Sequence, residues 1–247
     1  MKNYGIIIEA RTGSTRFPNK VIKKIGNLTL LDYLIDRVKY QNQIKKIIIA
    51  TTKKKKDNKI IKIAKKNKIN FFRGSENDLI DRISRAAKKN NIENIIQVTA
   101  DNPFFDIDIL KKLLKKFKTR KYDFVSNSLN SSFPIGSDIR IFSLSSLLKY
   151  SYFVRGQARQ HTCYFFLKNS EKVRTYNLKA QGKYRRPNYR LTVDFKNDFE
   201  LVKKIIIELG FKYYGLKKII NLLDKNKKMI KINSNLPKKI KIQSYKY

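Results

Sequence analysis

The chain has 247 residues, enough to bury a sizeable core and to form one or two domains. No stretch approaches the roughly 20 uninterrupted apolar residues that a membrane helix needs, and a lone cysteine, Cys163, cannot close an intrachain disulfide. The formal net charge of +38 comes from lysines spread along the whole chain, which indicates compositional drift rather than a nucleic-acid-binding patch. We therefore expect a cytoplasmic protein with neither membrane nor nucleic-acid partners.

The first half of the chain alternates short apolar runs with amphipathic segments. The apolar runs predict strands at Tyr4–Ile8, Ile47–Ala50, Ile69–Phe72, Ile95–Thr99 and Phe124–Ser126. Apolar residues at spacings of three and four predict helices at Leu30–Lys39, Asn58–Asn67, Asp78–Lys89 and Ile107–Phe117. This alternation of strand and helix predicts an α/β fold with a mostly parallel sheet covered by helices.

The pattern changes after about Leu129. We predict strands at Asp138–Phe142, Val173–Leu178 and Tyr189–Val193, and helices at Phe153–Lys168 and Asn197–Leu209. The first part of this region would form a substrate lid or a dimer surface. Residues 1–224 are predicted to form one domain, and residues 225–247 a basic, loosely attached C-terminal tail.

The segment from Glu9 to Lys20 follows the first predicted strand and combines glycine, hydroxyl and basic residues in one loop. Ligands of open α/β sheets bind at the carboxyl ends of the strands, where backbone N–H groups can hold phosphate oxygens. Arg11, Arg16 and Lys20 would add positive charge. The loop does not satisfy the Walker A pattern, and an ordinary polar turn in a lysine-rich protein is the alternative.

Two aspartates, Asp101 and Asp194, each follow a predicted strand. Such a pair could hold Mg²⁺, which takes one or two protein carboxylates and completes its coordination with water and phosphate oxygens. The alternatives are an ordinary loop aspartate for Asp101 and a helix cap for Asp194 or Asp198.

Several motifs together resemble the cytidylyltransferase superfamily, which includes the 3-deoxy-manno-octulosonate and N-acylneuraminate cytidylyltransferases. The resemblance is strongest to its spore coat polysaccharide biosynthesis protein F branch and covers roughly Tyr4 to Leu209. The motifs are ARTGSTRFPNKV from Ala10, FRGSENDLIDR from Phe71, TADNPF from Thr99, RQHT from Arg159 and TVDFKNDFEL from Thr192. This resemblance implies a three-layer α/β/α Rossmann-like nucleotidyltransferase fold with a small insertion for substrate or dimer contacts.

The resemblance also implies roles for individual residues. Arg16, Lys20 and Asp101 would be catalytic, and Asp101 with Asp194 would hold Mg²⁺. Asp138 and His161 fall in the region expected to meet the acceptor sugar, although His161 could equally be a core or interface histidine. The residues implied in nucleotide binding are Ala10, Arg11, Gly13, Ser14, Arg16, Lys20, Arg73, Ser75, Asp81 and Arg82. For Asp81 and Arg82 a surface ion pair is the alternative.

Three positions depart from the family pattern. Glu9 stands where the nearest branch usually has glutamine, and Asn19 replaces the usual glycine before the lysine. Arg140 occupies a position that is often acidic, which puts the family's acceptor preference in doubt and could recruit a carboxylate.

The resemblance implies a Mg²⁺-dependent cytidylyltransferase that transfers CMP from CTP to a sugar acid, of nonulosonic or 3-deoxy-octulosonic type, and releases pyrophosphate. It would work as a homodimer in surface polysaccharide or glycan biosynthesis. Three alternatives stay open: transfer from another nucleoside triphosphate to a sugar 1-phosphate, a nucleotide-binding module without activity, and a basic nucleic-acid-binding protein.

Overall fold

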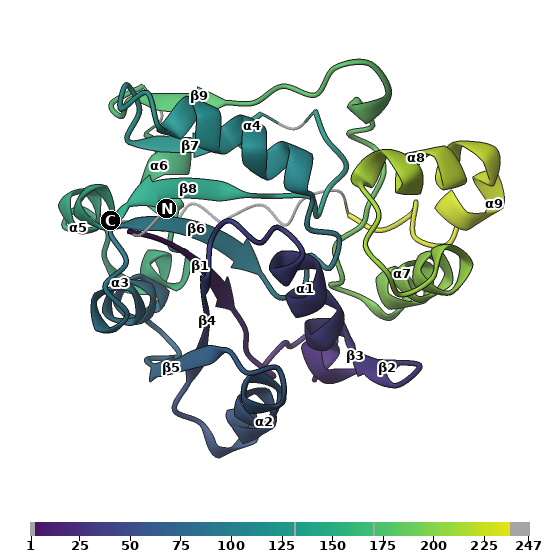
Figure 1. Cartoon of the computed structure of the whole chain (residues 1–247), viewed down its shortest axis with the longest axis horizontal. Coiled ribbons are helices and arrows are strands. Elements are labelled where there is room, and N and C mark those ends of the chain that lie inside the picture. Colours follow the sequence, from purple (N-terminus) through teal and green to yellow (C-terminus); the bar gives the residue numbers. More distant parts are fainter. Residues whose placement is uncertain (1–2, 131, 170, 238–247) are drawn as a thin grey trace.

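The computed structural model describes residues 3–130, 132–169 and 171–237. Its centre is a seven-stranded sheet with the strand order β5-β4-β1-β6-β8-β7-β9 (Figure 1). The strands are β1 (Tyr4–Glu9), β4 (Lys46–Thr52), β5 (Asn70–Gly74), β6 (Asn94–Thr99), β7 (Phe124–Ser126), β8 (Arg140–Ser143) and β9 (Thr175–Asn177). Strand β8 runs antiparallel to both of its neighbours, and the other pairings in this sheet are parallel. The predicted mostly parallel sheet is therefore confirmed.

Helices cover both faces of this sheet (Figure 1). One face carries α1 (Leu30–Lys39), α2 (Asn58–Lys66) and α4 (Ile107–Phe117), and the other carries α3 (Leu79–Lys89), α5 (Leu144–Ser151) and α6 (Tyr164–Lys168). Helices α7 (Lys196–Leu209), α8 (Leu216–Lys225) and α9 (Lys227–Ile230) gather at one side of the molecule, and a short hairpin joins β2 (Lys24–Ile25) to β3 (Leu28–Thr29). The expected layered α/β architecture is confirmed.

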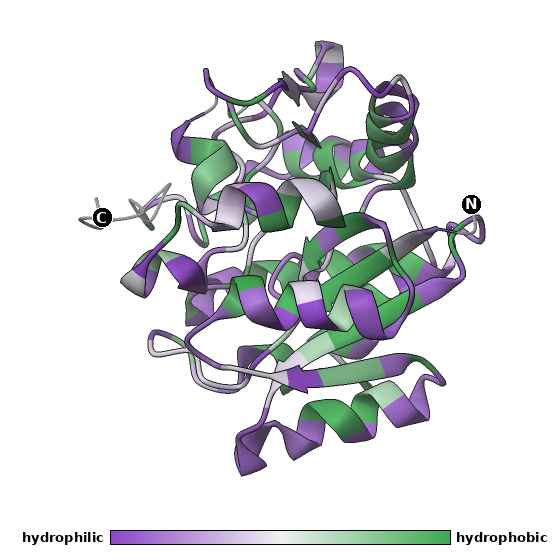
Figure 2. Ribbon diagram, turned by 90° about the vertical axis from the view of Figure 1, so that its left-hand side faces the viewer, coloured by the Kyte–Doolittle hydropathy of each residue, from purple (hydrophilic) through white to green (hydrophobic). Residues whose placement is uncertain are grey.

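The central strands are buried on both faces, which explains their unbroken apolar sequence. In β1, Ile6 and Ile8 belong to one apolar cluster and Ile7 to the other, and all three side chains are fully buried. Figure 2 shows the same pattern, with apolar strands enclosed by helices whose outer surfaces are hydrophilic. Burying one such side chain contributes about 1.5–3 kcal/mol, so these strands form the most strongly held part of the fold.

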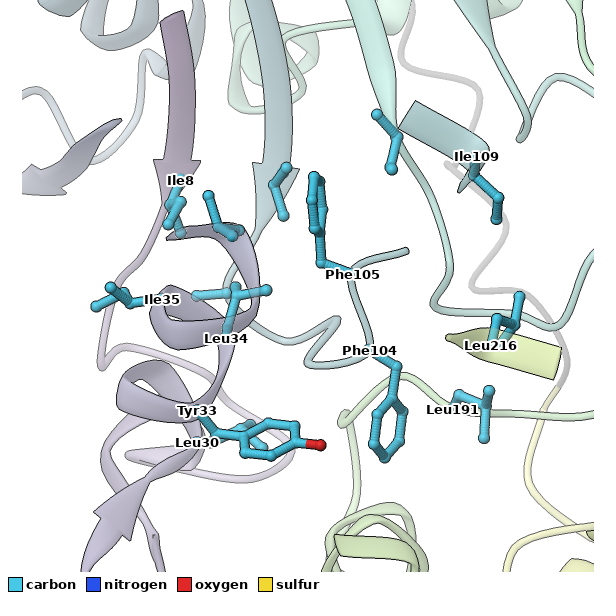
Figure 3. Close-up of a cluster of buried hydrophobic side chains, with 14 of the residues drawn as sticks. Ile8, Leu30, Tyr33, Leu34, Ile35, Phe104, Phe105, Ile109, Leu191 and Leu216 are labelled. Carbon is cyan, nitrogen blue, oxygen red and sulfur yellow. The ribbon is translucent and has the colours of Figure 1, made fainter. Parts of the chain in front are cut away.

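Two phenylalanines after β6 fix the turn that carries Asp101. Phe104 and Phe105 are buried in the cluster of Figure 3, close to Tyr33 and Leu34 of α1. The ring of Phe104 meets that of Tyr33 edge-on, with 6.1 Å between the centroids. The loop of residues 9–20 is called the signature loop, and α1 follows it in the chain. The chain leaving β6 is thereby held against α1, which brings both segments to the same edge of the sheet.

The predicted helix Phe153–Lys168 is wrong. The segment contains a short 3-10 turn, Gly156–Gln160, followed by α6 from Tyr164, while an unpredicted helix, α5, precedes it. Gly156 has a φ of 54°, a left-handed conformation that a right-handed helix cannot contain. His161 follows the 3-10 turn in extended backbone, so its predicted place on a helix is wrong as well.

The predicted strand Tyr189–Val193 is wrong too, although its backbone is tied down. It forms one isolated bridge, between Ile135 and Arg190, and the N–H of Val193 donates to the carbonyl of Asp101 at 2.8 Å. A Cβ on Gly136, whose φ is 94°, would lie 2.3 Å from the backbone nitrogen of Thr192. The segment therefore pairs with a glycine-containing loop and with the Asp101 turn instead of adding a strand to the sheet.

The start of the predicted tail is packed against the domain. Residues 227–230 form α9, Met229 is buried, and the buried Asn233 donates to the Asp198 carboxylate at 2.8 Å. Loose attachment is therefore wrong for residues 227–237, while residues 238–247 lie outside the described residues, and the boundary at residue 224 stays a prediction. Over the described ranges, none of the helices is long and apolar enough to cross a membrane.

Candidate active site

The signature loop leaves β1 and is held by a buried carboxylate that the sequence did not single out. Asp57 is fully buried, and its Oδ1 accepts hydrogen bonds from the backbone N–H and the hydroxyl of Thr12, at 2.8 and 2.6 Å. Its Oδ2 accepts from the hydroxyl of Thr52 at the end of β4. A carboxylate with three donors and no access to water fixes the start of the loop relative to the neighbouring strand.

The loop then closes on itself. The N–H groups of Ser14 and Asn19 both donate to the carbonyl of Thr12, at 2.9 and 3.1 Å. Asn19 has a φ of 60° and a ψ of 17°, which is the left-handed conformation that glycine adopts freely and asparagine tolerates. The asparagine therefore preserves the turn for which the family uses glycine, and it directs Lys20 inward.

The ammonium group of Lys20 lies between the two aspartates predicted to hold metal. Its Nζ is 2.7 Å from Oδ2 of Asp101 and 2.9 Å from Oδ1 of Asp194. Burial works against the charged forms of Lys20 and Asp101. The two carboxylates nevertheless raise the pKa of Lys20, and the Lys20 ammonium lowers the pKa of Asp101. Lys20 and Asp101 are therefore both charged at neutral pH.

Asp194 also contacts two arginines. Its Oδ1 accepts from Nη2 of Arg16 at 3.0 Å, and its Oδ2 accepts from Nη2 of Arg190 at 3.0 Å. Arg190 in turn donates to both oxygens of the buried Asp198, at 2.8 and 3.1 Å. The backbone N–H groups of Asp194 and Phe195 donate to Asp198, so Asp198, and not Asp194, caps α7. The cap alternative is thus confirmed for Asp198 only.

The residue types of this cluster fit Mg²⁺. Asp101 and Asp194 supply hard oxygen ligands at one point, and Mg²⁺ needs only one or two protein carboxylates when phosphates complete its coordination. Within residues 3–130, 132–169 and 171–237, no three His, Cys, Asp or Glu side chains converge as they would in a metal site made wholly of protein ligands. The fit is therefore to a metal that arrives with a phosphate-bearing ligand.

A second polar cluster lies beside the first, on the sheet face covered by α3 and α6. Gln97 of β6 donates from Nε2 to Oε2 of Glu9 at 2.7 Å, and the Cys163 thiol donates to Oε1 of Gln97 at 2.8 Å. Burial, the largest influence on each group, raises the pKa of Glu9 and raises that of Cys163 to about 12. The cysteine is therefore a neutral hydrogen-bond donor and not a nucleophile.

Arg140 faces this cluster from the start of β8, directly opposite Gln97 in the strand register. Its Nη2 donates to Oδ2 of Asp138 at 3.1 Å, and its buried Nε finds no hydrogen-bond partner among the described residues. Burial, followed by the charges of Arg140 and Arg11, lowers the pKa of His161. The predicted acceptor residues Asp138 and His161 are thus brought together with Arg140.

The predicted nucleotide-binding residues divide into two groups. Ala10, Arg11, Gly13, Ser14, Arg16 and Lys20 all lie on the signature loop; Ala10 and Lys20 are buried, Gly13 and Ser14 are partly buried, and Arg11 and Arg16 are exposed. Arg73, Ser75, Asp81 and Arg82 lie at the end of β5 and the start of α3.

This second group is occupied mainly by internal contacts. Arg73 donates to the backbone carbonyls of Thr52, the last residue of β4, and of Lys53 and Lys54, at 3.1, 2.7 and 3.1 Å. Arg82 is buried and donates to the carbonyl of Ser75, and burial lowers its pKa. Asp81 pairs with Arg85 at 3.8 Å, so the alternative of a surface pair between Asp81 and Arg82 is wrong. Their role in nucleotide binding stays a prediction.

Sequence reasoning missed Thr12, Asp57, Gln97 and Arg190. One signal was present for Asp57, because it is the first carboxylate after four consecutive lysines, Lys53–Lys56, and a lone acid in a basic run often has a buried cationic or hydrogen-bonding partner. Gln97 and Arg190 gave no such signal, since each lies within a run read as a strand.

Comparison with known proteins places this geometry in a class. The sequence profile of the cytidylyltransferase family matches residues 5–232. The solved structure of a cytidylyltransferase from Leptospira borgpetersenii is 34% identical with a TM-score of 0.88, and the match covers 93% of this chain and 97% of that one. A CMP:2-keto-3-deoxy-manno-octonic acid synthetase solved in complex with CTP is 16% identical with a TM-score of 0.62, over 84% of this chain and 99% of that one, which shows the shared fold alone.

Relatives of similar sequence include further members of this class. The spore coat polysaccharide biosynthesis protein SpsF of Bacillus subtilis is 30% identical, over 92% of this chain and 96% of that protein. An uncharacterized protein of Methanocaldococcus jannaschii is 32% identical, over 97% of each chain, and a 3-deoxy-manno-octulosonate cytidylyltransferase of Solibacter usitatus is 31% identical over 40% and 39%. The fold is that of a nucleotidyltransferase. The chain belongs to the cytidylyltransferase family, as the sequence motifs predicted.

Proposed function

We propose that this enzyme transfers CMP from CTP to a sugar acid, of nonulosonic or 3-deoxy-octulosonic type, with Mg²⁺ as the cofactor and pyrophosphate as the second product. One observation carries the proposal: the Lys20 ammonium and the Asp101 and Asp194 carboxylates meet beside the signature loop, at the carboxyl ends of the parallel strands. The relatives add the substrate class, because their names include 3-deoxy-manno-octulosonate cytidylyltransferase and a protein of spore coat polysaccharide biosynthesis.

The loop supplies the groups that a triphosphate needs. Arg11 and Arg16 are exposed on it, and the Arg16 guanidinium is already oriented by Asp194 and by the Phe195 ring, 5.4 Å from its centroid. In phosphoryl-type transfers, alignment and charge neutralisation supply most of the catalysis, so the pyrophosphate leaving group would be stabilised by Arg16 and Lys20. Mg²⁺ held by Asp101 and Asp194 would polarise the α-phosphate and neutralise its charge. No protein nucleophile is needed.

The acceptor would bind in the neighbouring polar cluster. Glu9, Gln97 and Asp138 offer hydrogen-bond partners for sugar hydroxyls, and Arg140 offers a guanidinium to the carboxylate of a sugar acid. Because this cluster adjoins Asp101, whose charge also acts on Glu9 and Arg140, an acceptor hydroxyl held there would face the metal-binding pair. The nucleophile is the sugar's own hydroxyl: its oxygen bonds to the α-phosphorus of CTP while the bond to pyrophosphate breaks, and the enzyme contributes by holding the two groups in line.

Three further parts of the proposal concern the whole protein. We propose a homodimer in the cytoplasm that takes part in surface polysaccharide or glycan assembly and binds no nucleic acid. Sedimentation analysis tests whether the protein is a dimer. Binding assays with mixed-sequence DNA and RNA test the absence of nucleic-acid binding, and we expect no binding at low or high salt concentration. Tight, steeply salt-dependent polynucleotide binding without CTP turnover would instead favour the nucleic-acid alternative.

The test is pyrophosphate release in the presence of Mg²⁺, with CTP, UTP, GTP or ATP offered against nonulosonic acids, 3-deoxy-octulosonate and sugar 1-phosphates. We expect release with CTP and a sugar acid. Asp101→Asn should abolish it while the variant stays folded, whereas the same change at the exposed Asp108 should leave it intact. Release with a sugar 1-phosphate would instead assign the enzyme to the alternative transferase class.

A further inference from the structure

Lys20 occupies the position between the two proposed metal ligands. Its ammonium contacts one oxygen of Asp101 and one of Asp194, at 2.7 and 2.9 Å, and its side chain is only 9% exposed. We propose that Lys20 is a resident counter-cation that blocks metal binding to the free enzyme, and that a nucleoside triphosphate draws it away, so that metal and nucleotide bind together. This inference rests on the proposed function and deepens it.

The contacts of the two carboxylates support the first half of the proposal. Three of their four oxygens accept hydrogen bonds from cationic side chains: Asp101 Oδ2 from Lys20, Asp194 Oδ1 from Lys20 and Arg16, and Asp194 Oδ2 from Arg190. A divalent cation that bridged the same carboxylates would have to replace these donors. It would also be repelled by three positive groups within the same small volume.

The carboxylates also need a cation when no ligand is bound. Asp101 and Asp194 are brought together by the turn after β6 and the segment before α7, where the N–H of Val193 donates to the carbonyl of Asp101. Two neighbouring carboxylates repel each other unless a cation lies between them. The Lys20 ammonium contacts both carboxylates, offsets this repulsion and holds the two groups together.

The position of Lys20 in the chain supports the second half. It follows Asn19 at the end of the signature loop, so its four-carbon side chain starts beside the proposed triphosphate site. A triphosphate presents several anionic oxygens that can replace the two carboxylates as partners for the ammonium. When Lys20 turns to them, the carboxylate oxygens become free for Mg²⁺. Linkage then requires that nucleotide and metal raise each other's affinity by the same factor.

Direct binding of Mn²⁺, followed by electron paramagnetic resonance of the free ion, tests this without catalysis. We expect the wild-type enzyme to bind Mn²⁺ at least about ten-fold more tightly with a non-hydrolysable CTP analogue than without it. Lys20→Met should bind Mn²⁺ about ten-fold more tightly than wild type when no nucleotide is present, and should lose most of the dependence on nucleotide. Lys24→Met is the matched control, because Lys24 is exposed in β2 and contacts neither carboxylate.

Thermal unfolding is a second readout, which distinguishes a change in metal binding from misfolding of the variant. Without metal, Lys20→Met and Lys20→Gln should both melt below wild type, because the partly buried Asp101 and Asp194 lose the ammonium group that bridges them, and Mn²⁺ should restore much of that loss. The inference is overturned if Lys20→Met binds Mn²⁺ no more tightly than Lys24→Met, or if wild-type Mn²⁺ affinity is the same with and without the analogue. The absence of Mn²⁺ binding in every variant, even with the analogue, would overturn the proposed metal site and this inference together.

Discussion

Asp57 offers the sharpest test of how the loop is held. Asp57→Asn keeps the shape of the side chain but replaces a carboxylate that accepts three hydrogen bonds, two from Thr12 and one from Thr52. A hydrogen bond to a charged group contributes about 1.5–3 kcal/mol and a neutral one about 0.5–1.5 kcal/mol. Weakening three bonds by about 1 kcal/mol each gives an expected loss of about 3 kcal/mol in the free energy of unfolding.

Urea unfolding and steady-state kinetics measure the two consequences. Asp57 contacts none of the residues predicted to bind substrate and acts through Thr12, which lies in the signature loop. We therefore expect the KM for CTP to rise several-fold while the KM for the acceptor changes little. Asp108→Asn is the control, since Asp108 is exposed in the first turn of α4 and should cost less than about 1 kcal/mol. An Asp57→Asn enzyme with wild-type stability and wild-type CTP kinetics would refute the reasoning.

Three further predictions follow from single positions. Arg140→Met should raise the KM for an acidic acceptor about ten-fold and leave the KM for CTP unchanged; equal effects on both would contradict a role in acceptor binding. Because burial raises the pKa of Cys163 to about 12, the folded protein should resist thiol reagents at about pH 8. The raised pKa should also stabilise the folded state at pH values below the ordinary thiol pKa of about 8.5, and this contribution is lost as the pH rises toward the pKa of the folded state. Rapid labelling of folded protein would contradict this. Asn19→Gly should change the free energy of unfolding by less than about 1 kcal/mol, whereas Asn19→Val should cost about 1–2 kcal/mol; a tolerated valine would contradict the left-handed assignment.

The strand–helix alternation was readable because the central strands are buried on both faces. A run such as Tyr4–Ile8 is continuously apolar for that reason, and the helix Leu30–Lys39 was predicted with its observed bounds because its apolar residues recur at spacings of three and four. The prediction failed where tertiary contacts decide the conformation. The Tyr189–Val193 segment has the composition of a strand, but its partners are a loop and the Asp101 turn, which local sequence does not reveal.

The site was predictable to the extent that it lies at strand ends. Lys20 and Asp101 follow the neighbouring strands β1 and β6, whereas the segment of Asp194 is not a strand and is held by the hydrogen bond from Val193 to the carbonyl of Asp101. The three side chains thereby come within hydrogen-bonding distance. The sequence could not show that Lys20 bridges the two carboxylates, because that contact depends on the left-handed turn at Asn19 and on the Asp57 anchor. Motifs thus identified the residues, and only the fold defined how their charges are paired.

The most direct measurement is ³¹P nuclear magnetic resonance of the enzyme with CTP, Mg²⁺ and a sugar acid, with Asp101→Asn as the control. Our account predicts that the CTP signals are replaced by those of pyrophosphate and of a new phosphodiester, and that the variant produces neither. Intact CTP with every sugar acid, together with consumption of another nucleoside triphosphate and a sugar 1-phosphate, would contradict the central claim.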